Sequence, residues 1–276
     1  MNGFIQKFDK ICQKDKIKTQ NTYFTNYKLI SIFMHISLSP ETIFFVGKFP
    51  VTNTLLTCWI AMIILIIIAF LISKKIQLLP KRFQNVIEIL IESLLKLVQD
   101  ITNNKKQTEK FFPLVATIFI FVLFSNWLGI FPGVGTIGFK ENGVFVPFFR
   151  SVYSDLNMTI ALALISVFAC QFFGIIACGF LKYAGKFINF KSPITFFVGI
   201  LELISEIAKL ISFSFRLFGN IFAGEVLLVV IAFLVPFIIP LPFMALELFV
   251  GFIQALVFAM LTLVFLKMAT IIHDEH

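Results

Sequence analysis

One arginine stands inside an apolar stretch in the last third of the chain. Arg216 lies in the segment SFSFRLFGNIFAGE (212–225), which has strongly apolar neighbours on both sides. An arginine at the centre of a lipid bilayer costs about 2.5–3.5 kcal/mol on insertion scales and roughly 10–17 kcal/mol in simulations. The sequence therefore favours one of two roles for this charge, a packing ion pair with a buried acid or a part in moving ions.

Ionisable and amide side chains accompany this arginine at helical spacing. Six residues between positions 202 and 220 are spaced three or four positions apart, so on a helix they form a narrow stripe along one face. Glu225 lies nine residues beyond Arg216, half a turn away in angle and about 13 Å further along the axis. On the next apolar segment, Glu247 and Gln254 are seven residues apart and share a face. The stripe consists of Glu202, Glu206, Lys209, Phe213, Arg216 and Asn220.

These residue types predict proton movement. Carboxyl groups buried in a membrane can load and release protons, whereas an arginine keeps its charge at any working pH. Carboxylates on different faces of a helix, with a permanent cation between them, predict two separate proton routes and an electrostatic barrier. Glu206 and Lys209 also have a simpler interpretation, as an i,i+3 ion pair near an interface. We interpret Lys267 as a residue at the end of a helix whose charged group reaches toward the membrane surface.

The composition places these residues in a membrane protein. Of the 276 residues, 59% are hydrophobic and only 14% are charged, whereas about 25% are charged in a typical soluble domain. The apolar runs are continuous and lack the period-two alternation of barrel strands. The net charge of +8 comes largely from basic residues between these runs, which indicates contact with anionic lipid and no binding of nucleic acid. We predict an all-α integral membrane protein.

Five segments are long enough to span a bilayer, at about 20 helical residues per crossing. Residues 193–235 contain no internal proline, and a helix of that length would be about 64 Å long, so it must tilt steeply or break. We predict that it forms a hairpin with the last helix. Residues 81–103 carry recurring polar residues on one side and predict an amphipathic interfacial helix. The predicted spans are 51–73, 111–131, 156–180, 193–235 and 243–272.

The basic residues favour one orientation. Segments 74–110 and 181–192 hold eight and three Lys or Arg residues, and the loop 132–155 holds two. The positive-inside rule places the first two segments inside and the loop outside. The N-terminus then lies outside and the C-terminus inside, against the lysine-rich character of the first residues. We predict a single membrane domain over 51–276, preceded by an N-terminal extension (1–50) with no recognisable motif.

The sequence predicts no cofactor and no metal. It contains neither G-x-x-x-x-G-K-[ST] nor G-x-G-x-x-G, the motifs that bind phosphates of nucleotides. The four cysteines form no C-x-x-C pair, and the three histidines lie outside the long apolar runs. These residues are Cys12, Cys58, Cys170, Cys178, His35, His273 and His276.

Three stretches, in order, resemble one family. RLFGNIFAGE (216–225), followed by a proline turn and IQALVFAMLTLVFL (253–266), closely resembles subunit a of the F-type ATP synthase. FPLVATIFIFVLFSNWLGIFPG (112–133) is similar to the second membrane helix of that family, and SDLNMTIALAL (154–164) to the start of its next helix. The resemblance covers about residues 50–276. It implies a stator protein beside a rotating ring of c subunits, with the b subunits of the peripheral stalk and the other synthase subunits as partners.

The resemblance also implies roles for single residues. Arg216 would face the ion-binding carboxylate of the ring, force it to release its proton, and prevent a short circuit between two half-channels. Glu225 and Glu247 match the pair that lines the channel open to the outside. The remaining matches are Asn220 and Gln254 near the arginine, Glu202 and Ser205 near the channel open to the cytoplasm, and Asp155 and Asn157 at the outer mouth.

One position separates branches of this family. Many members place a histidine in the pair that corresponds to Glu225 and Glu247, whereas this chain has Glu at both. Two carboxylates in proximity are expected to titrate in two separate steps. The AGE form (223–225) is typical of bacterial more than mitochondrial members and favours a bacterial inner membrane. The composition, rich in Phe, Ile, Lys and Asn, also suits an organellar inner membrane. The choice of H⁺ or Na⁺ rests largely with the ring.

Two other classes of protein fit less well. A secondary transporter would show repeated halves with paired broken helices, but the charges inside the apolar runs concentrate after residue 200. A structural scaffold would not need carboxylates on both faces of a helix around one arginine.

Overall fold

The computed structural model describes residues 40–74, 82–131, 134, 137–141, 144–180, 183, 185, 193–235 and 238–270. Most of the predicted N-terminal extension, with Cys12 and His35, lies outside these residues, as do His273, His276 and most of the basic segment 181–192.

Within the described residues, five helices are long and apolar enough to cross a membrane. The predicted all-α class with five spans is therefore confirmed. Helix α4 begins six residues before the predicted span, because the side chain of Asn104 accepts a hydrogen bond from Lys106 N at 3.0 Å and caps the helix there. Helix α8 begins at Pro240, and a proline is tolerated in the first helical turn. The five helices are α2 (Asn53–Ser73), α4 (Lys105–Ile130), α5 (Leu156–Cys178), α7 (Pro193–Leu234) and α8 (Pro240–Thr270).

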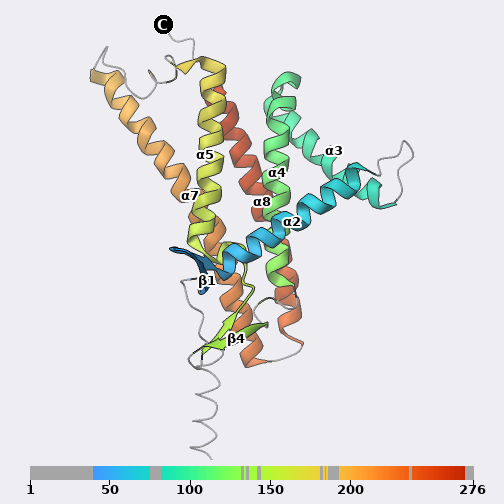
Figure 1. The fold of residues 1–276 in the computed structure, drawn as a ribbon. Coiled ribbons are helices and arrows are strands. Elements are labelled where there is room, and N and C mark those ends of the chain that lie inside the picture. Colours follow the sequence, from blue (N-terminus) through green and yellow to red (C-terminus); the bar gives the residue numbers. More distant parts are fainter. Residues whose placement is uncertain are drawn as a thin grey trace, which may run out of the picture.

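Helix α7 is continuous over its 42 residues. The alternative that this segment breaks is therefore wrong. At about 1.5 Å per residue the helix is about 63 Å long, roughly twice the 30 Å of the hydrocarbon layer. Figure 1 shows α7 running obliquely past α5 and turning at its far end into α8, so the two longest helices form the predicted hairpin.

The core lies where α4, α5, α7 and α8 pack together. Small side chains allow close approach of the helices, since Ala163, Ala255 and Ala259 are fully buried. Polar contacts link the same helices: Asn126 Nδ2 donates to Gly251 O at 3.0 Å, and the hydroxyls of Ser166 and Thr262 lie 2.7 Å apart. The core side chains include Phe119, Val122, Leu217, Phe258 and Leu263.

Helix α3 (Arg82–Thr102) forms where the amphipathic helix is predicted. Leu94 and Val98 on its apolar side are buried, while Glu88 and Glu92 are exposed. Lys267 on α8 donates from Nζ to Ile101 O at 2.7 Å, so this lysine joins α8 to the end of α3 and is more than a snorkelling end residue. The position of α3 at a membrane surface stays a prediction.

Two short hairpins were not predicted. Strands β1 (Thr42–Val46) and β2 (Phe49–Thr52) pair antiparallel, as do β4 (Gly138–Glu141) and β5 (Val144–Pro147). Both hairpins lie in the half of the bundle that holds the end of α7 and the start of α8, together with the 3-10 helix η1 (Val152–Ser154), and the end of α8 lies in the other half (Figure 1). We call these the hairpin end and the C-terminal end. The described part of the loop 132–155 and Thr270, the last described residue, thus lie at opposite ends, as the predicted topology requires.

Candidate functional site

Two glutamates meet near the hairpin end. The carboxylate of Glu247 on α8 packs against Gly224 on α7, so that a Cβ atom at Gly224 would lie only 3.0 Å from Glu247 Oε1. Glu225 is the next residue of α7, so its carboxylate lies close to that of Glu247. The structure therefore brings together the two carboxylates that the sequence assigned to one pair.

A buried arginine completes this cluster. Arg150, in the loop before η1, is 8% exposed, and its Nε lies 3.9 Å from Glu225 Oε1. Its backbone N–H donates to the hydroxyl of Thr57 on α2 at 3.2 Å, which fixes the loop. The side chain of Ser154 also approaches the carboxylate of Glu225. We call Arg150, Glu225 and Glu247 the outer cluster.

Sequence reasoning missed Arg150. It was counted as one of two basic residues in a loop, because nothing in a single sequence indicates that this loop folds back over α7. The one available signal was the position of Arg150 five residues before Asp155, at the edge of the motif SDLNMTIALAL.

Asp155 lies buried at the start of α5, near the same end. Its Oδ1 accepts a hydrogen bond from Asn157 N at 2.9 Å and caps the helix, and its Oδ2 accepts from Thr54 Oγ1 at 3.0 Å. Asp155 therefore joins α5 to α2, and Asn157 itself is exposed. These contacts give Asp155 a structural role, which is independent of any role in ion transport.

Arg216 lies on an exposed face of α7. Its Nη2 donates to Ser212 Oγ at 3.4 Å, one turn earlier on the same helix. The large apolar side chains beside it, Ile211 and Phe215, are 49% and 56% exposed. Asn220 is half-buried one turn further along. Lipid cannot solvate a guanidinium, so inside a membrane a charge on such a helix face is favourable only beside water or a polar partner.

The other predicted residues near Arg216 do not contact it. Among the described residues, no hydrogen bond joins Arg216 to Asn220 or to Gln254, which is half-buried on α8. The pairing of Arg216 with a buried acid of this chain is likewise not found in the part that the structure describes, whose ion pairs are Arg150–Glu225 and Lys209–Glu206.

The predicted stripe does not stay on one face of the protein. Phe213 is 2% exposed, and its ring lies 4.7 Å from that of Phe258 and 5.5 Å from that of Phe265, between centroids. Arg216, less than one turn later, is exposed. Helix α7 crosses its neighbours obliquely (Figure 1), so successive residues of one stripe face first the core and then the open side.

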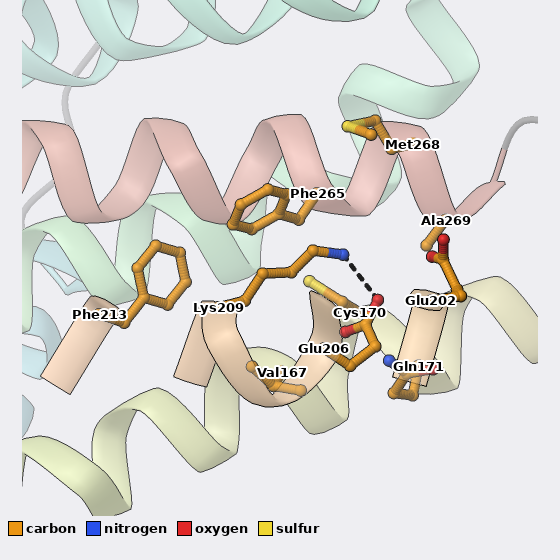
Figure 2. A pocket seen from close by; sticks show the side chains of 10 residues that line it. All are labelled: Val167, Cys170, Gln171, Glu202, Glu206, Lys209, Phe213, Phe265, Met268 and Ala269. Carbon is orange, nitrogen blue, oxygen red and sulfur yellow. Dashed lines mark hydrogen bonds and ion pairs between the residues drawn. The ribbon is translucent and has the colours of Figure 1, made fainter. Parts of the chain in front are cut away.

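The first part of the stripe lines a pocket between α5, α7 and α8, near the C-terminal end. Lys209 Nζ donates to Glu206 Oε1 at 2.6 Å, which confirms the predicted i,i+3 pair. Figure 2 shows this pair in the middle of the pocket, with Glu202 at one end and Phe213 at the other. Ser205, three residues after Glu202 on α7, is exposed and does not line the pocket.

Comparison with known proteins assigns this architecture to a family. Residues 55–267 match the ATP synthase A chain family. The chain belongs to the ATP synthase A chain family. It is 38% identical over 217 residues to the ATP synthase subunit a of Campylobacter jejuni subsp. jejuni serotype O:23/36 (strain 81-176), a match that covers 78% of this chain and 88% of the relative. It is 39% identical over 223 residues to the subunit a of Campylobacter concisus (strain 13826), covering 79% and 90%.

The chain is a multi-pass membrane subunit of an ATP synthase complex, and it functions in ion transport and ATP synthesis. In the part of this A chain that the structure describes, no group of three or more His, Cys, Asp or Glu side chains is arranged to hold a metal ion.

Proposed function

We propose that this chain supplies the stationary ion path of the synthase, as two offset half-channels that pass protons to and from a rotating ring of c subunits. One observation carries the proposal. Two polar clusters lie at opposite ends of α7, the outer cluster and the pocket around Glu206, and buried aromatic rings lie between them. From Glu206 to Glu225 the helix rises about 28 Å, close to the thickness of the hydrocarbon layer.

The outer cluster supports a half-channel open to the outside. Glu225 and Glu247 are the only carboxylates that α7 and α8 place near the hairpin end in the described part of the chain. Two neighbouring carboxylates can hold and pass on a proton, and Arg150 offsets part of their mutual repulsion. Asp155 and Asn157 then belong to the outer mouth, where Asp155 also anchors α5.

Arg216 acts at the contact with the ring. Its guanidinium stays charged at any working pH, and it lies on a helix face whose apolar side chains are open. A carboxylate on a neighbouring c subunit would pair with this charge and lose its proton in doing so. The same charge repels protons that would otherwise pass directly between the two half-channels, and Asn220 and Gln254 would line its surroundings.

The proposed setting is a bacterial inner membrane, since the relatives are subunits a of Campylobacter species. The chain would bind the c ring through the exposed face of α7 and the b subunits of the peripheral stalk through other helices. The nucleotide sites would lie in other subunits of the complex.

Cross-linking tests which face meets the ring. A cysteine at Ser212 should form a disulfide with a cysteine placed next to the ion-binding carboxylate of the c subunit, under mild oxidation of membranes that contain the whole complex. The matched control is Ile165→Cys, which is 59% exposed but lies on α5. A cross-link from Ser212→Cys alone supports the proposal, whereas a cross-link from Ile165→Cys alone places the ring elsewhere and contradicts it.

A further inference from the structure

The pocket between α5, α7 and α8 places several polar side chains among apolar ones in the interior of the helix bundle. Its volume of about 320 Å³ is large enough to hold several waters. Three helices contribute its walls: Gln171 and Cys170 come from α5, Glu202 and Glu206 from α7, and Phe265 from α8 (Figure 2). Polar partners on several sides are what a buried water requires, so this pocket suits water.

The ion pair in the pocket is held on several sides. Lys209 Nζ contacts Glu206 and lies 4.8 Å from the centre of the Phe265 ring. The side chains of Lys209 and Glu206 are only 16% and 18% exposed. An ion pair removed from bulk water is favourable only where further polar groups or waters satisfy it. Its position in a pocket large enough for water meets that condition.

A tyrosine fixes the polar wall of the pocket. The hydroxyl of Tyr183 hydrogen-bonds to Gln171 Oε1. Burial, and after it the negative charge of Glu206, raises the pKa of Tyr183 to about 12. The phenol therefore keeps its proton at any physiological pH and serves as the donor to Gln171. This leaves the carboxylates of Glu202 and Glu206 as the groups in the pocket that can gain a proton.

The pocket is closed toward the middle of the membrane. Phe213 lines its far end, and the rings of Phe258 and Phe265 pack against Phe213. No polar side chain from α8 lines the pocket. These apolar rings offer no hydrogen-bonding group to a proton on the direct way to the outer cluster, which favours an exit sideways, past α7.

We propose that this pocket is the water-filled inlet of the inner half-channel and that Glu206 is a proton carrier in it, with Lys209 as its counter-ion. The inference rests on the proposed function. A proton from the inside water would bind the Glu206 carboxylate, so that an O–H bond forms and the contact with Lys209 loosens. The O–H bond then breaks as the proton passes to water on the way to the face of α7 that carries Arg216, whereas Glu202, one turn nearer the C-terminal end, would precede Glu206 on the way in. The titratable groups that face Glu206 are Lys209, Glu202, Cys170 and Tyr183.

Substitution of Glu206 separates a proton carrier from a packing residue. In the assembled complex, Glu206→Gln should lower ATP-driven proton pumping by at least roughly tenfold, because the amide cannot exchange a proton, whereas Glu206→Asp should keep most of the rate. The matched control, Glu92→Gln, removes an exposed carboxylate from α3 and should have no effect. If Glu206→Gln pumps like the wild type, the proposal is wrong.

A double variant removes the remaining ambiguity. Glu206→Gln leaves Lys209 with an unmatched charge, and this alone could disturb the fold. Glu206→Gln/Lys209→Gln removes both charges. Its pumping should stay low, because the carboxylate is still missing. Recovery of wild-type pumping in the double variant would mean that the pair is a packing element, and would overturn the proposal.

The native cysteines report whether water reaches the pocket. Cys170 lines the pocket and Cys58 is buried in α2, near the hairpin end. Complexes that retain only one of these cysteines in this chain are treated with 2-aminoethyl methanethiosulfonate in inverted vesicles, whose cytoplasmic face is outward. Modification should slow pumping by the complex that retains Cys170. Pumping by the complex that retains Cys58 should not change. If Cys170 does not react, or if it is fully modified and pumping stays normal, this pocket is not an inlet. Cross-linking of Ser212→Cys to the ring is independent of that result.

Discussion

The carboxylate of Glu247 rests directly on Gly224, with Oε1 only 3.0 Å from the position that a Cβ atom would take. Glycine at this position leaves room for a charged side chain of α8 against the backbone of α7. The contact holds Glu247 beside Glu225, the next residue along. The outer cluster thus depends on a residue that carries no side chain at all.

Gly224→Ala should displace Glu247 and lower proton pumping. Overpacking a close contact typically costs about 1–3 kcal/mol, which should leave the complex assembled. Pumping by inverted vesicles, normalised to the amount of assembled complex, measures the effect. Glu247→Asp shortens the side chain by one methylene, so the double variant Gly224→Ala/Glu247→Asp should pump faster than Gly224→Ala. If Gly224→Ala pumps normally, the position of Glu247 does not matter for transport.

Arg150→Gln should lower pumping, because Glu225 and Glu247 would lose the cation nearest to them. Arg150→Lys retains the charge and should keep part of the rate. Lys48→Gln removes an exposed cation near the same end and serves as the control. Equal rates for Arg150→Gln and Lys48→Gln would show that Arg150 takes no part in the outer cluster.

Asp155→Ala should destabilise the protein, since loss of a helix cap costs about 0.5–2 kcal/mol and Thr54 also loses its acceptor. A lower midpoint of thermal unfolding of the purified complex measures this. Thr54→Val removes only the tie between α2 and α5 and should lower the midpoint less. Asp155→Asn keeps an amide oxygen for the cap. If Asp155→Asn preserves stability but abolishes pumping, the carboxylate itself acts in transport. If the Asp155→Asn complex still pumps, the role of Asp155 is structural.

Phe213→Ala should open a leak through the bundle. The ring fills the space between the pocket and the middle of the membrane, and its removal leaves a cavity. An imposed pH gradient should decay faster in vesicles that contain this variant, whereas Phe213→Leu should stay tight. Because a buried Phe→Ala change typically costs about 3–5 kcal/mol, assembly has to be verified first. A tight Phe213→Ala complex would contradict the aromatic barrier.

The helices could be predicted from the sequence because their signal is local. Long apolar runs predicted α2, α4, α5, α7 and α8, and the absence of internal proline predicted that α7 could run on. The hairpins β1–β2 and β4–β5 were missed, because strands of four or five residues give too short a pattern to recognise.

The site was predictable only where residues lie on one helix. The i,i+3 spacing of Glu206 and Lys209 was sufficient to predict that their side chains form an ion pair. The pairing of Glu225 with Glu247 followed from family resemblance, and the contact with Gly224 that creates it joins two helices. Arg150 reaches Glu225 across 75 residues of sequence, and no local pattern encodes that distance. Phe213 faces the core and Arg216 faces the open side because α7 crosses its neighbours obliquely, and this crossing is not encoded in the spacing along one helix.

ATP-driven acidification of inverted membrane vesicles with Arg216→Ala tests the central claim most directly. The control Lys106→Ala removes an exposed cation at the start of α4, and assembly is verified in both. The account predicts that the Arg216→Ala complex assembles but no longer acidifies the vesicles, while Lys106→Ala acidifies them normally. Acidification at the wild-type rate by Arg216→Ala would show that this arginine is a packing residue, and would contradict the proposed mechanism.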